Sequence, residues 1–121
     1  MREPRGWTPL VVKKSKAGKP GMSALDFLMA WYRTQCNGTW EHAYGVTIET
    51  LDNPGWMVMI DLTGTALEDG TMQAVSFQRS DTDWLSCKVE HKRFRGAGDS
   101  QKLPVILQTF QEWATKASQV K

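Results

Sequence analysis

The chain has 121 residues, of which 40% are hydrophobic and 23% are charged. This length and composition are typical of one globular domain that buries its core without disulfides, and they exclude a wholly disordered chain. The apolar runs are far shorter than the roughly 20 residues that span a bilayer. With two cysteines and no secretory apolar region, the sequence predicts a reduced, cytoplasmic protein and no membrane association.

The net charge of +2 hides an uneven distribution of charge along the chain. Residues 1–21 carry six basic side chains and one acid, whereas the remaining residues carry nine basic and twelve acidic groups. We therefore predict a basic, flexible leader at residues 1–21 and a single, mildly acidic domain at residues 22–121. A basic arm can contact nucleic acid. A solvated tail, or sequence upstream of a start at Met22, explains the leader more simply.

The first predicted helix begins after Ser23, a good N-cap residue, with Asp26 placed as in a capping box. The Asn37-Gly38 pair is typical of a helix end. Two apolar stripes follow helical spacing, so we expect the helix to be buried on more than one side. The main stripe consists of Leu25, Leu28, Met29, Tyr32 and Cys36, and the second of Phe27 and Trp31.

Alternating apolar residues then predict strands near residues 46–50, 56–62, 72–79, 85–89 and 93–95. Between the first two, Pro54 and Gly55 occupy the second and third positions expected of a type II turn. A tight turn is expected at His91-Lys92. Because the connections are short, the strands should run antiparallel, as a meander.

A closing helix is predicted from the helical spacing of apolar residues between Leu103 and Ala114, with Pro104 tolerated in the first turn. The segment Gly96–Gly98 should form the turn that leads into it. The predicted fold is therefore α+β, an antiparallel four- to five-stranded meander sheet flanked by an N-terminal and a C-terminal helix.

Enzymatic and metal-binding readings find little support. Two thiols and two imidazoles match the ligand count of structural zinc, but their spacing does not form a knuckle, and Cys36 and Cys87 fall on apolar faces. The sequence contains no P-loop, dinucleotide-binding or nucleophile-elbow motif. We predict no catalytic residue, no cofactor and no metal site. The zinc alternative would use Cys36, His42, Cys87 and His91.

A basic patch is the best nucleic-acid signal in the domain, because it interleaves cations with an aromatic ring. A charged edge strand that discourages sheet-to-sheet pairing explains the same pattern more simply. Nucleic acid binding therefore remains the alternative function, through the leader and this patch. The patch consists of Lys88, His91, Lys92, Arg93, Phe94 and Arg95.

The six tryptophans are a high number for this length. Three of them lie beside acids at predicted strand starts or loops, which suits a protein-binding surface, since aromatic rings anchor interfaces and acids attract a basic partner. For each ring alone, capping the end of the sheet core is an equally good explanation. The predicted partner-binding residues are Trp40, Glu41, His42, Tyr44, Asp52, Asn53, Trp56, Asp83 and Trp84.

These same residues carry a resemblance to a known family. Cys-Asn-Gly-Thr-Trp-Glu-His-Ala-Tyr-Gly at residues 36–45 and Leu-Asp-Asn-Pro-Gly-Trp at residues 51–56 are similar to the signatures of the immunity protein 53 family of bacterial polymorphic toxin systems. The resemblance covers about residues 24–115. It continues through Ile60–Thr65, Asp83-Trp84, Cys87–Glu90, Gly96–Gly98 and the helix ending Phe110…Trp113-Ala114. Pro104 and His91 depart from the family pattern, and the leader is additional to it.

The resemblance implies a small cytosolic antidote that binds one cognate toxin domain tightly and has no catalytic residues. Many toxins of such systems are nucleases with basic clefts, which an acidic antidote could occlude. We expect a monomer or a small homo-oligomer.

Overall fold

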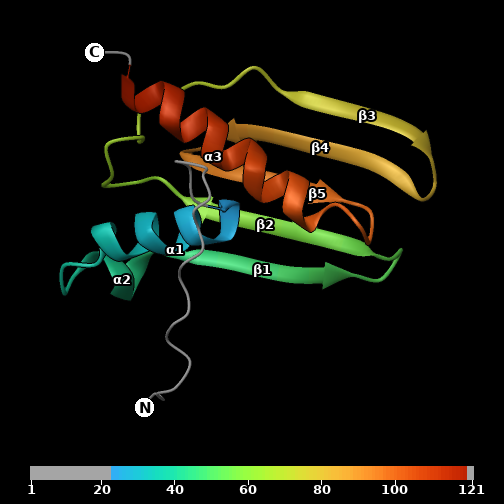
Figure 1. Cartoon of the computed structure of the whole chain (residues 1–121). Coiled ribbons are helices and arrows are strands. Elements are labelled where there is room, and N and C mark those ends of the chain that lie inside the picture. The colour runs from blue at the N-terminus through green and yellow to red at the C-terminus, as the bar shows by residue number, and fades with distance from the viewer. Residues whose placement is uncertain (1–22, 120–121) are drawn as a thin grey trace.

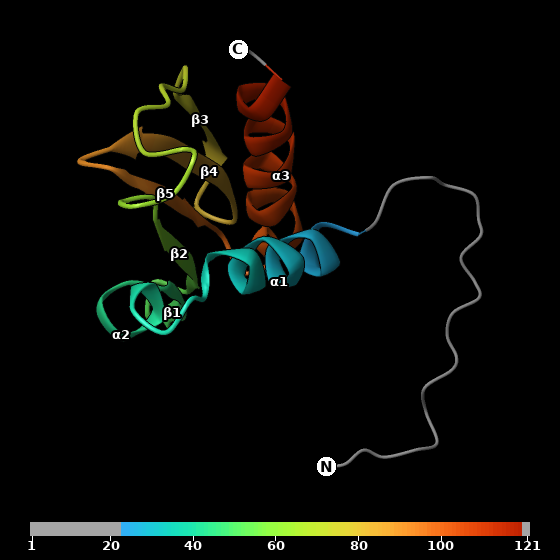
Figure 2. The ribbon, with the colours of Figure 1, turned by 90° about the vertical axis from the view of Figure 1, so that its left-hand side faces the viewer.

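The computed structural model describes residues 23–119, which form a five-stranded antiparallel sheet with its two long helices on one face (Figures 1 and 2). The α+β class and the two flanking helices are thus confirmed. None of the helices in this range is long and apolar enough to cross a membrane. The predicted leader lies outside the described residues. The elements are α1 (Ala24–Gln35), α2 (Trp40–Ala43), β1 (Val46–Leu51), β2 (Gly55–Asp61), β3 (Val75–Ser80), β4 (Asp83–Glu90), β5 (Arg93–Gly98) and α3 (Leu103–Gln119).

The strand order is β1-β2-β5-β4-β3, which differs from a simple meander. Residues 62–74 carry the chain from β2, inside the sheet, to β3 at the far edge, so β2 pairs with β5 instead of β3. Buried side chains hold this connection in place: Leu67 joins the core, and the Trp113 indole N–H donates to the carbonyl of Thr71 at 2.8 Å. Strand spacing along the sequence shows short hairpins, but it does not show which strand a longer connection reaches.

The turns differ in how well the sequence predicted them. His91 and Lys92 have φ values of 54° and 61°, as a two-residue hairpin between antiparallel strands requires. The prediction of a type II turn at Pro54-Gly55 was wrong, because the Asn53–Pro54 bond is cis and Gly55 begins β2 without a positive φ. Gly55 is needed for close packing, because a Cβ there would meet the carbonyl oxygen of Gly98.

The core lies between α3 and the sheet. Val58, Ile60 and Phe94 are fully buried beneath Ile106 and Phe110 of α3. The expected turn at Gly96–Gly98 is instead the end of β5. Its glycines let α3 approach the sheet, since a Cβ on Gly96 would meet the side chain of Ile106.

The predicted cap of α1 is confirmed, because the Ser23 hydroxyl accepts from the Asp26 N–H at 3.0 Å. The prediction that the main apolar stripe of α1 is the buried one was wrong. Phe27, Leu28 and Trp31 face the core instead. The ring centroids of Phe27 and Trp31 lie 6.1 Å and 5.3 Å from that of Phe110. The remaining stripe residues Leu25, Met29 and Tyr32 are exposed, and Cys36 caps the helix. Both stripes have helical spacing, so only the position of α3 decides which is buried.

Replacing Gly96 with Ala tests the close approach of α3. The new methyl group would overpack the core against Ile106 and Phe94, so we expect the free energy of unfolding in urea to fall by about 1–3 kcal/mol. Gly45→Ala is the matched control, because a Cβ at Gly45 meets nothing within 4 Å. An equal effect of the two substitutions would contradict this packing.

Candidate partner-binding site

The structure divides the predicted partner-binding residues between the two ends of the sheet. Trp40, Glu41, His42 and Tyr44 lie in or beside α2, where β1 begins. Asp52, Asn53, Trp56, Asp83 and Trp84 lie at the opposite end, around the β1–β2 and β3–β4 turns (Figure 1). The nine residues therefore do not form one continuous surface.

At the α2 end, Trp40 belongs to the framework of the fold. It is 5% exposed, and its indole N–H donates to the carbonyl of Thr63 at 2.8 Å. Its ring meets those of Trp31, Tyr32 and Tyr44, each at a centroid distance of 6.1 Å. This tryptophan attaches α2 to α1 and leaves little surface for a partner.

Glu41 is also committed to local structure. Its carboxylate accepts from the backbone N–H groups of Asn37 and Gly38 at 2.9 Å and 2.8 Å. Hydrogen bonds from the backbone N–H of Glu41 itself and from these two N–H groups hold the pKa of its carboxyl below the usual range. His42 and Tyr44 remain exposed and free to meet a partner.

At the other end, Asn53 and Trp84 line an open depression of about 400 Å³ together with Gln78 and Asp81. Alternation along the strands places Trp84 on the sheet face that the helices leave uncovered. Trp56 lies on the opposite, helix-covered face, where its indole N–H donates to the carbonyl of Ser100 at 3.1 Å. The sequence missed Gln78 and Asp81, which only the β3–β4 hairpin brings beside Asn53.

A buried carboxylate that the sequence did not single out organises this end. Asp99 is 2% exposed and accepts from the backbone N–H groups of Trp84 and Gln101, both at 2.9 Å, and from Lys102 Nζ at 2.6 Å. Lys102 also donates to Asp83 at 2.8 Å. The Asp99 contact with an N–H two residues on is the usual turn role of Asp, and a Gly-Asp-Ser sequence before a helix is a signal that could have found it.

Within this network the ammonium group of Lys102 pairs with the carboxylates of both Asp83 and Asp99. The Lys102 ammonium, with the two backbone N–H groups, lowers the pKa of Asp99 to about 2 and holds the pKa of Asp83 below its usual range. The two carboxylates in turn raise the pKa of Lys102, Asp83 contributing most. The network therefore positions the turns, and Asp83 is held by the fold.

The four candidate zinc ligands are not brought together. Cys87 is buried beneath α3, whereas His91 lies exposed at the β4–β5 turn. Cys36 and His42 lie near α1 and α2, with the Cys36 thiol donating to the carbonyl of Tyr32. Within residues 23–119, no group of three or more His, Cys, Asp or Glu side chains is placed to hold a metal ion.

The four lysine and arginine side chains of the basic patch pair with three neighbouring acids. Arg93 pairs with Asp61 at 2.9 Å and Lys92 with Glu68 at 3.0 Å. Lys88 and Arg95 both approach Glu90, at 3.4 Å and 3.9 Å. A phosphate backbone would have to compete with each of these acids, so the patch gives no support to nucleic acid binding.

The Asp99 network predicts an acid-sensitive fold. A carboxyl whose pKa is lower in the folded than in the unfolded chain stabilises the fold above pH 4, and this contribution is lost as pH falls toward 2. Asp99→Asn should flatten the decline of unfolding free energy between pH 4 and pH 2, measured by urea denaturation at each pH. Asp52→Asn, at an exposed turn residue, should leave that slope as in the parent chain, and equal slopes in all three proteins would contradict the role of Asp99.

The two cysteines should differ in reactivity. Burial raises the pKa of the Cys87 thiol to about 11, so almost no thiolate forms at neutral pH. We expect iodoacetamide to alkylate Cys36 in the native protein and Cys87 only after unfolding in urea, as measured by peptide mass spectrometry. Alkylation of both residues at the same native rate would show that Cys87 is accessible.

The comparisons with known proteins bear on this arrangement. No curated protein and no solved structure matches the chain. The model of one family, immunity protein 53, matches residues 25–115. This range includes all five strands and α2, and it leaves out only the first residue of α1 and the last four residues of α3. The chain therefore belongs to the immunity protein 53 family.

Proposed function

We propose that this immunity protein binds a cognate toxin domain and neutralises it by occluding its active site. The proposal rests on the family and on one structural observation at the turn end of the sheet. There, Asp81 lines the depression beside Trp84, Asp52 precedes Asn53 of the same lining, and neither carboxylate makes an ion pair with any residue of the described range. We call Asp52, Asn53, Gln78, Asp81 and Trp84 the turn-end surface.

The chemistry of the turn-end surface suits binding of a basic partner. Trp84 is half-buried, so its ring is held in place while part of it remains available for contact. Trp84 also packs close to Gly55, where a Cβ would lie 3.3 Å from its ring. A rigid aromatic ring with free acids around it anchors and orients an interface, because the acids speed the encounter with a cationic surface and the ring supplies apolar contact.

The same surface is poorly suited to catalysis. The neighbouring carboxylates of Asp83 and Asp99 are ion-paired with Lys102, which lowers their pKa values and makes them weak general bases. No histidine lies at this end of the described chain, since His42 and His91 belong to the opposite end. We therefore assign the turn-end surface to recognition, with a toxin that presents cations, such as a nuclease, as its partner.

Charge reversal tests this assignment. The chain is co-expressed with the tagged toxin domain encoded beside its gene, and both growth rescue and co-purification are scored. Asp52→Lys with Asp81→Lys should weaken binding by about tenfold or more, with a larger loss at low salt than at physiological salt. Both residues are exposed, so the variant should retain the parental melting temperature.

Asp69→Lys with Glu112→Lys is the matched control. These acids are also exposed and make no ion pair with a described residue, but they lie away from the turn end. Equal affinity of both double variants at both salt concentrations would sink the assignment of the turn-end surface. Failure of the parent chain to rescue growth or to co-purify would sink the proposed function itself.

A further inference from the structure

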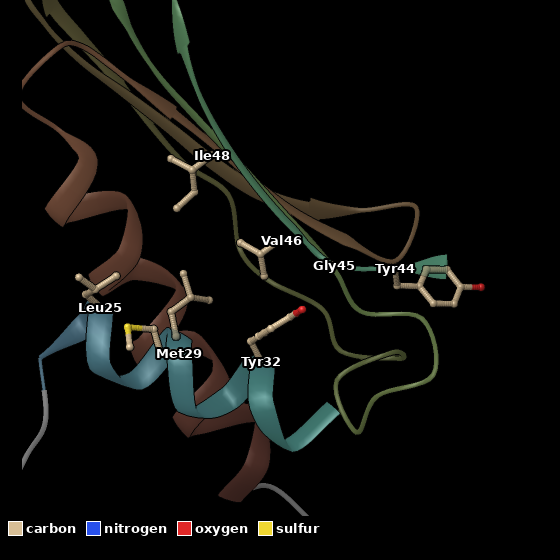
Figure 3. Close-up of a pocket in the computed structure, with 8 residues that line it drawn as sticks. Leu25, Met29, Tyr32, Tyr44, Gly45, Val46 and Ile48 are labelled. Atoms are coloured by element: carbon tan, nitrogen blue, oxygen red, sulfur yellow. The ribbon is translucent and has the colours of Figure 1, made fainter. Parts of the chain in front are cut away.

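An apolar groove separates α1 from β1 on the helix-covered side of the sheet. Figure 3 shows Leu25, Met29 and Tyr32 of α1 facing Val46 and Ile48 of β1 across it. The groove has a volume of about 470 Å³, with Leu28, Tyr44 and Gly45 completing its lining. Leu25 and Met29 are 53% and 58% exposed, so the groove is open to solvent.

The groove runs along the free edge of the sheet. β1 pairs only with β2, and the Asp61 N–H donates to the carbonyl of Gly45 at 3.0 Å. Because antiparallel ladder bonds alternate along a strand, residues 47, 49 and 51 also direct their backbone groups toward β2. The N–H and C=O groups of Val46, Ile48 and Thr50 therefore point outward from the edge.

This edge lacks the bulge, the proline and the basic residues that often block strand addition. β1 is regularly paired through six residues and contains no proline, lysine or arginine. The other edge strand, β3, has a register shift between Gln78 and Ser80 and carries Arg79. A regular, unguarded edge beside an apolar surface is a template for pairing with a further strand.

The charges around the groove favour a cationic occupant. Glu49 lies on the other face of β1 and Asp52 follows the strand. Neither acid pairs with a cation in the described part of the chain. Because β1 contains no lysine or arginine, the strand side of the groove carries negative charge only.

We infer that the β1 edge and this groove receive an extended segment of the cognate toxin, added to the sheet as a sixth strand. Six residues at about 3.4 Å each would match β1. Alternate apolar side chains would enter the groove, and a basic side chain would meet Glu49 or Asp52. The inference rests on the proposed function and adds a second contact region, at the edge of the sheet next to the turn end.

Two other occupants fit less well. The groove lies within the family-matched residues, whereas the leader, residues 1–21, lies outside them, so the leader is not part of the matched unit that forms the groove. A second copy would pair β1 with β1 about a twofold axis. That arrangement would bring two acidic rims together without a compensating cation.

Two variants test the two parts of the inference, using the full chain and the tagged toxin domain encoded beside its gene. Leu25→Gln with Met29→Gln removes apolar surface from the groove, and Thr50→Pro removes an outward N–H at a position that an edge strand tolerates. Each should weaken toxin binding about tenfold or more, measured by calorimetry. The control, Ala30→Gln with Thr34→Gln on the opposite exposed side of α1, should bind as the parent does.

Hydrogen exchange provides a readout that does not depend on side-chain substitution. The amides of Val46, Ile48 and Thr50 should exchange rapidly in the free protein and slowly in the complex. Unchanged exchange and unchanged affinity of both variants, while the parent still binds the toxin, would overturn the inference and leave the proposed function standing. Failure of the parent to bind would remove both.

The competing occupants give different results. Protection of these amides in the free chain that disappears in a chain starting at Met22 would identify the leader as the occupant. A dimer in sedimentation equilibrium that Thr50→Pro dissociates would identify a second copy. Either outcome overturns the inference.

Discussion

The structure depends on the aromatic contacts of Phe110. This fully buried ring on α3 meets Phe94 of the sheet at 5.3 Å, Trp113 of its own helix at 6.2 Å, and both Phe27 and Trp31 of α1. One side chain therefore joins the sheet to both long helices. Aromatic rings bury a large apolar area, and the contacts of Phe110 with Trp31 and Phe94 have the favourable edge-to-face arrangement.

The position of α1 follows from those contacts. Because α1 packs against α3 through Phe27 and Trp31, it lies beside the sheet edge and does not cover β1 closely. Its other stripe consequently faces Val46 and Ile48 across an open groove. At the far end of the sheet, Asp99 and Lys102 hold the start of β4 against α3, and neither Asp52 nor Asp81 makes an ion pair with a described residue. Internal packing thus creates both proposed contact regions.

Much of the fold could be predicted, because helices and strands leave local patterns. The α1 cap, the five strands, the His91-Lys92 turn and the place of Pro104 in α3 all follow from residues near one another in sequence. The Gly96–Gly98 segment misled for a physical reason. Glycine is typical both of a turn and of a strand that another element approaches closely. Here the close approach of the Ile106 side chain to Gly96 shows that the second explanation applies.

The candidate site could be predicted only in part. The sequence by itself determined the family, the surplus of tryptophan, the acidic domain and which residues could form helices and strands, since these depend on composition and local spacing. The tertiary structure alone decided that Trp40 and Glu41 support the fold, that the basic patch is paired with acids, and that Asp81 joins Asn53 and Trp84. It also decided which stripe of α1 is buried. Burial and charge pairing depend on elements far apart in the chain, and the strand order that brings them together leaves no local pattern.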